Sequence, residues 1–200
     1  MGSSLSGWGQ LWALLSLVAA ILCCSGFYLP YWIKGRLPGD VDTYLGTFRR
    51  CNYPKLTPQN TVEIVHQCAR YSRWWDIPSE WWRISTLLVG LASGLSLLIA
   101  VTAVSAICIP DVIHNITARI SGLVQLTAAL LVCAGCAVYP LGWDTREVKD
   151  ACGQSSQYKL GSCQVWWSAH MLAGAVGLLL VCFIFTLFPS RLTTPSILSL

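Results

Sequence analysis

Charged residues are missing from four long stretches of this chain. Residues 1–33, 84–110, 120–143 and 164–190 contain no Asp, Glu, Lys or Arg, and each reaches roughly the 20 residues that an α-helix needs to cross the hydrocarbon core of a bilayer. Only 11% of the chain is charged, against about 25% in soluble domains. A soluble core of 200 residues could not bury the 54% of hydrophobic residues, so the sequence predicts a four-span membrane protein.

Motifs that would indicate catalysis are also absent from the sequence. It has no G-x-S-x-G elbow, no P-loop and no H-E-x-x-H, and neither His66 nor His114 has companions at metal-ligand spacing. The net charge of +4 is not concentrated in the way nucleic-acid binding requires. A transporter would need charges or broken helices at the midplane. We therefore expect no enzyme, no cofactor, no metal site and no nucleic-acid partner, with the lipid bilayer as surroundings.

The expected organisation is one tetraspan domain over residues 1–200. We expect helices at about 9–33, 79–109, 117–140 and 165–188, large loops at 34–78 and 141–164 that share one side of the membrane, and a short loop at 110–116. β-Branched and aromatic residues predict strands at 43–53, 61–71 and 158–167. Asp76 or Ser79 is expected to cap the second helix. We expect the first span to stay in place as a helix, because it lacks the basic start and cleavage site of a signal peptide.

Four of the ten cysteines lie in the large loops, two in each: Cys51, Cys68, Cys152 and Cys163. An even number on one side predicts two disulfides formed in an oxidising compartment. Four cysteines allow three pairings, and a zinc site is an alternative that the lack of C-x-x-C spacing disfavours.

Basic residues argue for the opposite orientation. Of 13 Lys and Arg, all but Arg119 and Arg191 lie in the large loops or at their ends, which the positive-inside rule would assign to the cytoplasm. The sequon at Asn115 also lies in the short loop. We give the cysteines more weight, since paired thiols would be an anomaly in a reducing cytosol, and expect the large loops to lie outside the cell.

Small and polar residues within the spans predict close helix packing. Gly90 and Gly94 form a GxxxG pattern, and the last span repeats small residues at spacing four: Ala169, Ala173 and Gly177. Such stripes let backbones approach, either inside the bundle or toward another membrane protein. Gln125 is a lone amide in the third span and is expected to bond another helix, because an unsatisfied polar group is costly there.

Motifs in both large loops resemble known tetraspan proteins. Trp32, Gly46, Phe48, Arg49, Arg50, Cys51 and Cys68 are similar to the first-loop signature of claudins, except that Phe48 stands where claudins carry Trp. The run from Gly135 to Asp144, which includes Tyr139, Pro140, Gly142 and Trp143, is followed by Glu147-Val148 and Cys152-Gly153. Together these residues resemble the lipoma HMGIC fusion partner-like family, most of all its founding branch.

This resemblance implies a fold, a topology and a class of function. The implied fold is a left-handed four-helix transmembrane bundle with a small extracellular β-sheet, tied by disulfides Cys51–Cys68 and Cys152–Cys163. The termini would be cytoplasmic. The implied role is that of a non-enzymatic accessory or scaffolding subunit at the plasma membrane, which binds a receptor, channel or adhesion protein laterally. The alternative is a claudin-type junction or barrier protein, which Phe48 disfavours.

Two surfaces are candidates for partner contact. Basic and aromatic residues are interleaved at the end of the first large loop: Arg70, Arg73, Trp74 and Trp75. Arg and Trp are favoured at interface cores. The chain end Leu198-Ser199-Leu200 is a weaker candidate, as a ligand for a PDZ domain. Gly2 fits an N-myristoylation pattern, but a spanning helix anchors the chain better than one acyl chain could.

Overall fold

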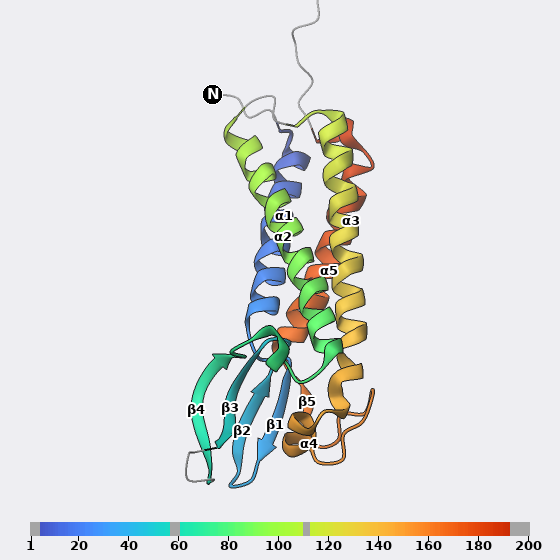
Figure 1. Cartoon of the computed structure of the whole chain (residues 1–200). Coiled ribbons are helices and arrows are strands. Elements are labelled where there is room, and N and C mark those ends of the chain that lie inside the picture. Colours follow the sequence, from blue (N-terminus) through green and yellow to red (C-terminus); the bar gives the residue numbers. More distant parts are fainter. Residues whose placement is uncertain (1–4, 57–60, 110–112, 193–200) are drawn as a thin grey trace, which may run out of the picture. The chain divides into compact units, whose positions relative to one another are not determined.

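Four long helices and one antiparallel sheet make up the computed structural model, which describes residues 5–56, 61–109 and 113–192 (Figure 1). The long helices are α1 (Gly7–Tyr28), α2 (Glu80–Cys108), α3 (Asn115–Val138) and α5 (Trp167–Thr186). By length and apolar composition, each can cross a membrane. The short helix α4 (Arg146–Cys152) follows a 3₁₀ segment at Tyr139–Asp144, and further 3₁₀ turns lie at Trp74–Asp76 and Pro189–Arg191.

The sheet contains residues from both large loops. Its strands are β1 (Ile33–Leu37), β2 (Val41–Leu45), β3 (Arg49–Leu56), β4 (Val62–Arg70) and β5 (Gln164–Val165), in the order β4-β3-β2-β1-β5. Strand β5 comes from the second large loop and pairs with β1, where Ile33 faces Val165. All pairings are antiparallel. Because β5 pairs with β1, the two loops form a single sheet.

The helix ends differ from the expected positions for local reasons. Helix α1 ends at Tyr28 and not near residue 33, since Pro30 disfavours helical backbone before it. Ile33 then starts β1. The cap of α2 is Ser79, whose hydroxyl accepts a hydrogen bond from the Trp81 N–H at 3.2 Å. Asp76 instead accepts a bond from the Arg73 N–H at 3.0 Å.

The strands also differ from expectation. Residues 43–53 contribute to two strands, because the chain turns at Gly46, whose N–H donates to the Arg49 carbonyl at 2.8 Å. Residues 158–167 supply only the short strand β5, and helix α4 forms where a loop was expected.

The chain divides into two compact units. The first consists of Met1–Cys24, Gly90–Cys133 and Leu172–Leu200, and the second of Ser25–Val89 and Ala134–Met171. The first unit has an apolar core of buried side chains: Leu5, Trp12, Ala13, Ile99, Ala103, Ala106, Ile113, Ala118, Cys182 and Leu192. The second unit contains the sheet and both disulfides.

A polar network lies inside the first unit. Gln125 on α3 is 1% exposed, and its amide donates a hydrogen bond to the Ser16 hydroxyl of α1 at 2.8 Å. The Trp12 indole N–H donates to the carbonyl oxygen of Gln125 at 3.3 Å. Ser16 in turn lies 3.7 Å from the sulfur of Cys182 on α5. The amide in the third span is therefore satisfied by another helix.

Close helix contacts inside the units use glycines of α3. A side chain at Gly122 would collide with Thr186 of α5, and one at Gly135 would meet Val89 of α2 at 2.5 Å. By contrast, Gly94, Ala173 and Gly177 are exposed on their helices, while Gly90 and Ala169 are half-buried. Three of the five predicted stripe positions on α2 and α5 thus face away from the bundle interior, which is instead packed by other small residues of these helices such as Ala92, Ala103 and Ala175.

Candidate functional site

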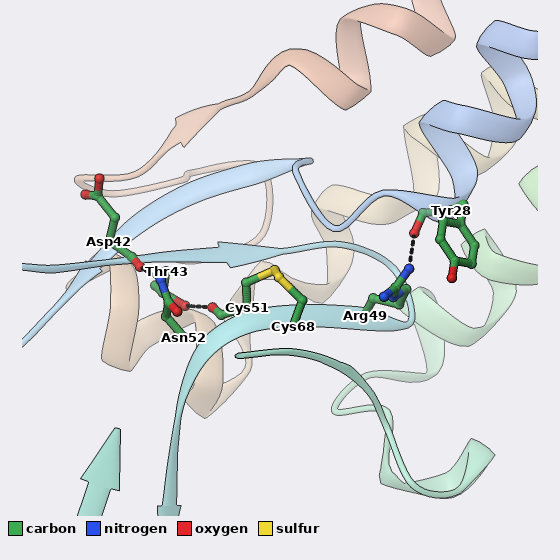
Figure 2. Close-up of a disulfide and its surroundings, with 7 residues drawn as sticks. All are labelled: Tyr28, Asp42, Thr43, Arg49, Cys51, Asn52 and Cys68. Carbon is green, nitrogen blue, oxygen red and sulfur yellow. Dashed lines mark hydrogen bonds between the residues drawn. A yellow bond between two sulfur atoms is a disulfide. The ribbon is translucent and has the colours of Figure 1, made fainter. Parts of the chain in front are cut away.

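The disulfide Cys51–Cys68 joins the two longest strands, as predicted from the sequence and the resemblance (Figure 2). The two cysteines face one another directly in the register of β3 and β4. Asn52 follows with a positive φ of 54°, a backbone conformation that Asn tolerates better than most residues, and the register shifts there. Its side chain donates to the Asp42 carbonyl at 2.7 Å, while Thr43 donates to the Cys51 carbonyl at 3.0 Å. These bonds tie the bulge to β2.

The second disulfide joins Cys152 to Cys163 at the end of α4. It packs closely on β1, because a side chain at Gly35 would meet the Cys163 sulfur at 2.6 Å and Ala151 at 3.1 Å. Each disulfide lies within one large loop. Noncovalent contacts must therefore hold the two loops together.

A side-chain cluster of Arg50, Tyr71 and Glu147 joins the two loops. The Arg50 guanidinium on β3 donates to the Glu147 carboxylate of α4 at 2.7 Å. The Tyr71 hydroxyl donates to the second carboxylate oxygen at 3.0 Å. The guanidinium also lies over two tyrosine rings, 4.2 Å from the centre of Tyr53 and 4.7 Å from that of Tyr71. Charge, hydrogen bonds and cation–π contacts thus converge on one group.

Burial strengthens this cluster. The side chains of Arg50 and Glu147 are 26% and 16% exposed, so solvent screens their attraction less than it would at the surface. Burial opposes the charged guanidinium, but the attraction of Glu147 and its hydrogen bond raise the pKa of Arg50 above its ordinary value. Burial, together with the nearby Glu147 charge, raises the pKa of Tyr71 far above 10. Tyr71 therefore remains a neutral donor at physiological pH.

Arg49, the neighbour of Arg50, has a different contact. It donates to the carbonyl of Tyr28 at 3.4 Å and lies 4.2 Å from the centre of the Tyr28 ring (Figure 2). Tyr28 is the last residue of α1, and a cation at a helix C-terminus is favoured by the helix dipole. The two motif arginines thus fix the sheet to different elements, Arg49 to α1 and Arg50 to α4.

The aromatic motif residues form the interior of the second unit. The Tyr139 ring lies 4.7 Å from Trp32, 5.0 Å from Trp82 and 6.3 Å from Trp143, centre to centre. The Tyr139 hydroxyl donates to the Leu45 carbonyl at 3.3 Å. Trp32 donates to the Gly26 carbonyl at 2.8 Å, and Trp82 to the Tyr139 carbonyl at 3.2 Å. These bonds satisfy most of the polar atoms that the aromatic residues bury.

Pro140 and two motif glycines make this packing possible. Helix α3 gives way to a 3₁₀ turn at Tyr139–Asp144, because Pro140 has no N–H to continue an α-helix. A side chain at Gly142 would collide with the Trp82 indole, and one at Gly46 would meet the Cα of Pro30 at 2.9 Å. Their conformations are ordinary, so both glycines are required for space.

Phe48 occupies the position where the claudin signature has Trp. Its ring packs against Phe27 of α1 with 4.9 Å between the ring centres. An aromatic side chain at this position therefore still anchors the first loop to a helix end.

The predicted partner surface surrounds the 3₁₀ turn at Trp74–Asp76. Trp75 is 74% exposed and Trp74 is 39% exposed. Arg83 fixes Trp75 from α2, since its guanidinium donates to the Trp75 carbonyl at 3.4 Å and lies 5.2 Å from the centre of the ring. Arg70 and Arg73 line a cavity beside this turn. The structure thus brings the four predicted residues to one region of the second unit.

Tyr71 is one of the aromatic residues interleaved with the loop arginines, and Glu147 belongs to a motif that carries the family resemblance, but neither was predicted to contact the other. Their partnership links residues 76 positions apart, and no local pattern signals such a contact. Within the described residues, no group of three or more His, Cys, Asp and Glu could hold a metal ion. Gly2 and the chain end at Leu198-Ser199-Leu200 lie outside those residues.

Comparisons with known proteins connect this architecture to one family. Residues 8–191 match the family described as lipoma HMGIC fusion partner-like protein. The chain is 30% identical to LHFPL tetraspan subfamily member 3 protein of Danio rerio, over 82% of this chain and 73% of that protein. It is 32% identical to the member 5 protein of Gallus gallus, over 80% and 69%. It is 30% identical to the member 4 protein of Mus musculus, over 92% and 73%.

The four membrane-spanning helices, the small antiparallel sheet and the disulfide Cys51–Cys68 form a claudin-like fold. The chain is a multi-pass membrane protein, and the matched region covers nearly all of the described residues. It belongs to the lipoma HMGIC fusion partner-like tetraspan family.

Proposed function

We propose that this protein is a non-enzymatic accessory subunit that binds a receptor, channel or adhesion protein laterally in the plasma membrane. In this proposal the disulfide-tied sheet lies outside the cell and both chain ends are cytoplasmic. Two disulfides in the large loops support this orientation, since disulfides persist in oxidising compartments.

The exposure of Trp75 carries the proposal. A tryptophan that is 74% exposed leaves a large apolar surface in contact with solvent or lipid. Arg83 contacts both the backbone carbonyl and the ring of Trp75. Trp75 also follows Trp74 in the same 3₁₀ turn. An exposed Trp that already contacts a neighbouring cation has less conformational entropy to lose on binding, and Trp is enriched among the residues that contribute most to interfaces.

The outward small residues of the helices support a lateral contact within the membrane. Gly94, Ala173 and Gly177 are exposed on α2 and α5, and a side chain added at Gly94 or Gly177 would meet nothing within 4 Å. Small residues let a helix of another protein approach closely. Both features favour association beside the protein and not catalysis within it.

Affinity purification of the full chain in mild detergent tests the proposal. Wild type should recover a membrane protein at a stoichiometric level, and Trp75→Ala should reduce that recovery at least tenfold, because interface hot spots contribute roughly 2 kcal/mol or more. The matched control is Trp8→Ala, which removes a 53% exposed Trp from the first unit and should leave recovery unchanged.

The outcome that removes this surface is equal recovery by wild type and Trp75→Ala. Loss of the partner in both Trp variants would also count against a specific contact at Trp75. Both variants replace exposed side chains and should therefore fold like wild type. Their melting temperatures check this before the recoveries are compared.

A further inference from the structure

A cavity of about 350 Å³ lies between the sheet and the helix ends within the second unit. Its lining comes from α1, the β2–β3 turn, the end of β4 with the segment that follows, and α2, and includes Phe27, Phe48, Arg70, Arg73, Ile77 and Thr86. Phe27 belongs to the last turn of α1, and Thr86 to the second turn of α2. Both turns are at the ends of membrane spans, where lipid headgroups meet the hydrocarbon.

The cavity is lined by two arginines and by no carboxylate. The neighbouring acid, Asp76, accepts a hydrogen bond from the Arg73 backbone N–H at 3.0 Å. Among the described residues, the guanidinium groups of Arg70 and Arg73 form no ion pair or hydrogen bond. The sheet register also sets Arg70 directly opposite Arg49, and like charges opposite one another in a sheet are destabilising. A bound anion would relieve this repulsion.

Most of the remaining lining is apolar or aromatic, with Ser72 and Thr86 as small polar members. Phe27 and Phe48 pack against each other with 4.9 Å between ring centres, and Ile77 is 3% exposed. A ligand that suits this cavity therefore needs an anionic oxygen group for the arginines and an apolar part for the phenylalanines. Arg binds phosphate in a planar, bidentate geometry.

We propose that the cavity binds a membrane phospholipid, with its phosphate at Arg70 and Arg73 and an acyl chain against Phe27 and Phe48. Phospholipids of both leaflets carry this phosphate, so the site does not depend on which way the protein faces. The inference goes beyond the proposed function, because it assigns the two arginines to lipid and leaves the exposed Trp75 for a protein partner.

Native mass spectrometry of the delipidated full chain tests the site. When dioleoylphosphatidylcholine is added back, we expect wild type to bind one molecule, and Arg70→Gln/Arg73→Gln to lower the bound-to-free ratio at least tenfold, because hydrogen bonds to charged groups are strong. Arg70→Lys/Arg73→Lys keeps the charge but loses the fork geometry and should bind at an intermediate level. The matched control, Arg146→Gln/Lys159→Gln, removes two charges from the second large loop away from the lining residues and should bind like wild type.

Two further ligands separate the contributions of phosphate and chain. Dioleoylglycerol has the same acyl chains without phosphate, and inorganic phosphate has no chains; both should bind at least tenfold more weakly than the phospholipid. Equal retention by the double Gln variant, or equal binding of dioleoylglycerol, would reduce the cavity to an apolar groove. Phosphate binding as tight as the lipid would make it a free-anion site and overturn the proposal.

Trp75→Ala distinguishes this inference from the proposed function. The variant should lose the protein partner and keep the lipid, whereas the double Gln variant should lose the lipid. If lipid retention falls in Trp75→Ala to the same extent, the two surfaces are not separate and the assignment of the arginines is wrong.

Discussion

Replacing Glu147 with Gln should destabilise the second unit, because Glu147 is the largely buried partner of Arg50. The side chain keeps nearly the same shape but loses the charge that faces Arg50 at 2.7 Å and the carboxylate that accepts from Tyr71 at 3.0 Å. The Arg50 guanidinium would remain largely buried without a counterion. Leaving a charge in this state is costly, because the desolvation it suffers is no longer offset.

The magnitude follows from the exposure of the pair. Breaking a fully buried ion pair costs about 3–5 kcal/mol, and residual exposure of 26% and 16% reduces this figure through solvent screening. We expect a loss of about 2–3 kcal/mol, in line with hydrogen bonds to charged groups of about 1.5–3 kcal/mol each. For a chain of this size the melting temperature should fall by about 4–12 °C.

Tryptophan fluorescence during heating in detergent measures this change, since Trp32, Trp82 and Trp143 surround Tyr139 in the same unit. Arg49→Gln is the matched control. Arg49 forms one long hydrogen bond and a cation–π contact, and its loss should cost about 1 kcal/mol or less.

A double-mutant cycle isolates the pair. Arg50→Gln and Glu147→Gln together should cost at least about 1 kcal/mol less than the sum of the two single changes, as expected for residues in direct contact. Strict additivity, or an equal effect of Arg49→Gln, would show that the pair does not hold the two loops together.

Two further predictions concern packing and orientation. Gly142→Ala should lower the free energy of unfolding by about 1–3 kcal/mol, because its methyl group would displace a buried indole. The control Gly94→Ala, whose methyl group would meet nothing within 4 Å, should leave the melting temperature unchanged or raised. Equal losses of stability in the two variants would contradict the packing argument. An impermeant maleimide added to intact, reduced cells should label Cys68, which is exposed, and should reach the exposed Cys108 only after permeabilisation. Labelling in the reverse order would place the large loops in the cytoplasm.

The four uncharged stretches determined the membrane-spanning helices, because length and apolar content are sufficient to specify a span. The motifs of both large loops, above all the run from Gly135 to Asp144, indicated the family, and the resemblance implied the disulfide Cys51–Cys68. The turn at Gly46 was not predicted, and it divides one expected strand into two. The position has no room for a side chain because of Pro30, which is distant in sequence, so the local pattern did not reveal this requirement.

Only the tertiary structure decided what the motif residues do. Arg49 and Arg50 are adjacent in sequence, yet one contacts the end of α1 and the other an acid 97 residues away. Likewise, Gly94 and Gly122 are both glycines within spans, but only Gly122 lies against another helix. Sequence specifies such residues by local periodicity and composition, whereas their partners depend on which faces meet when distant segments pack, and that information is not contained in any one segment.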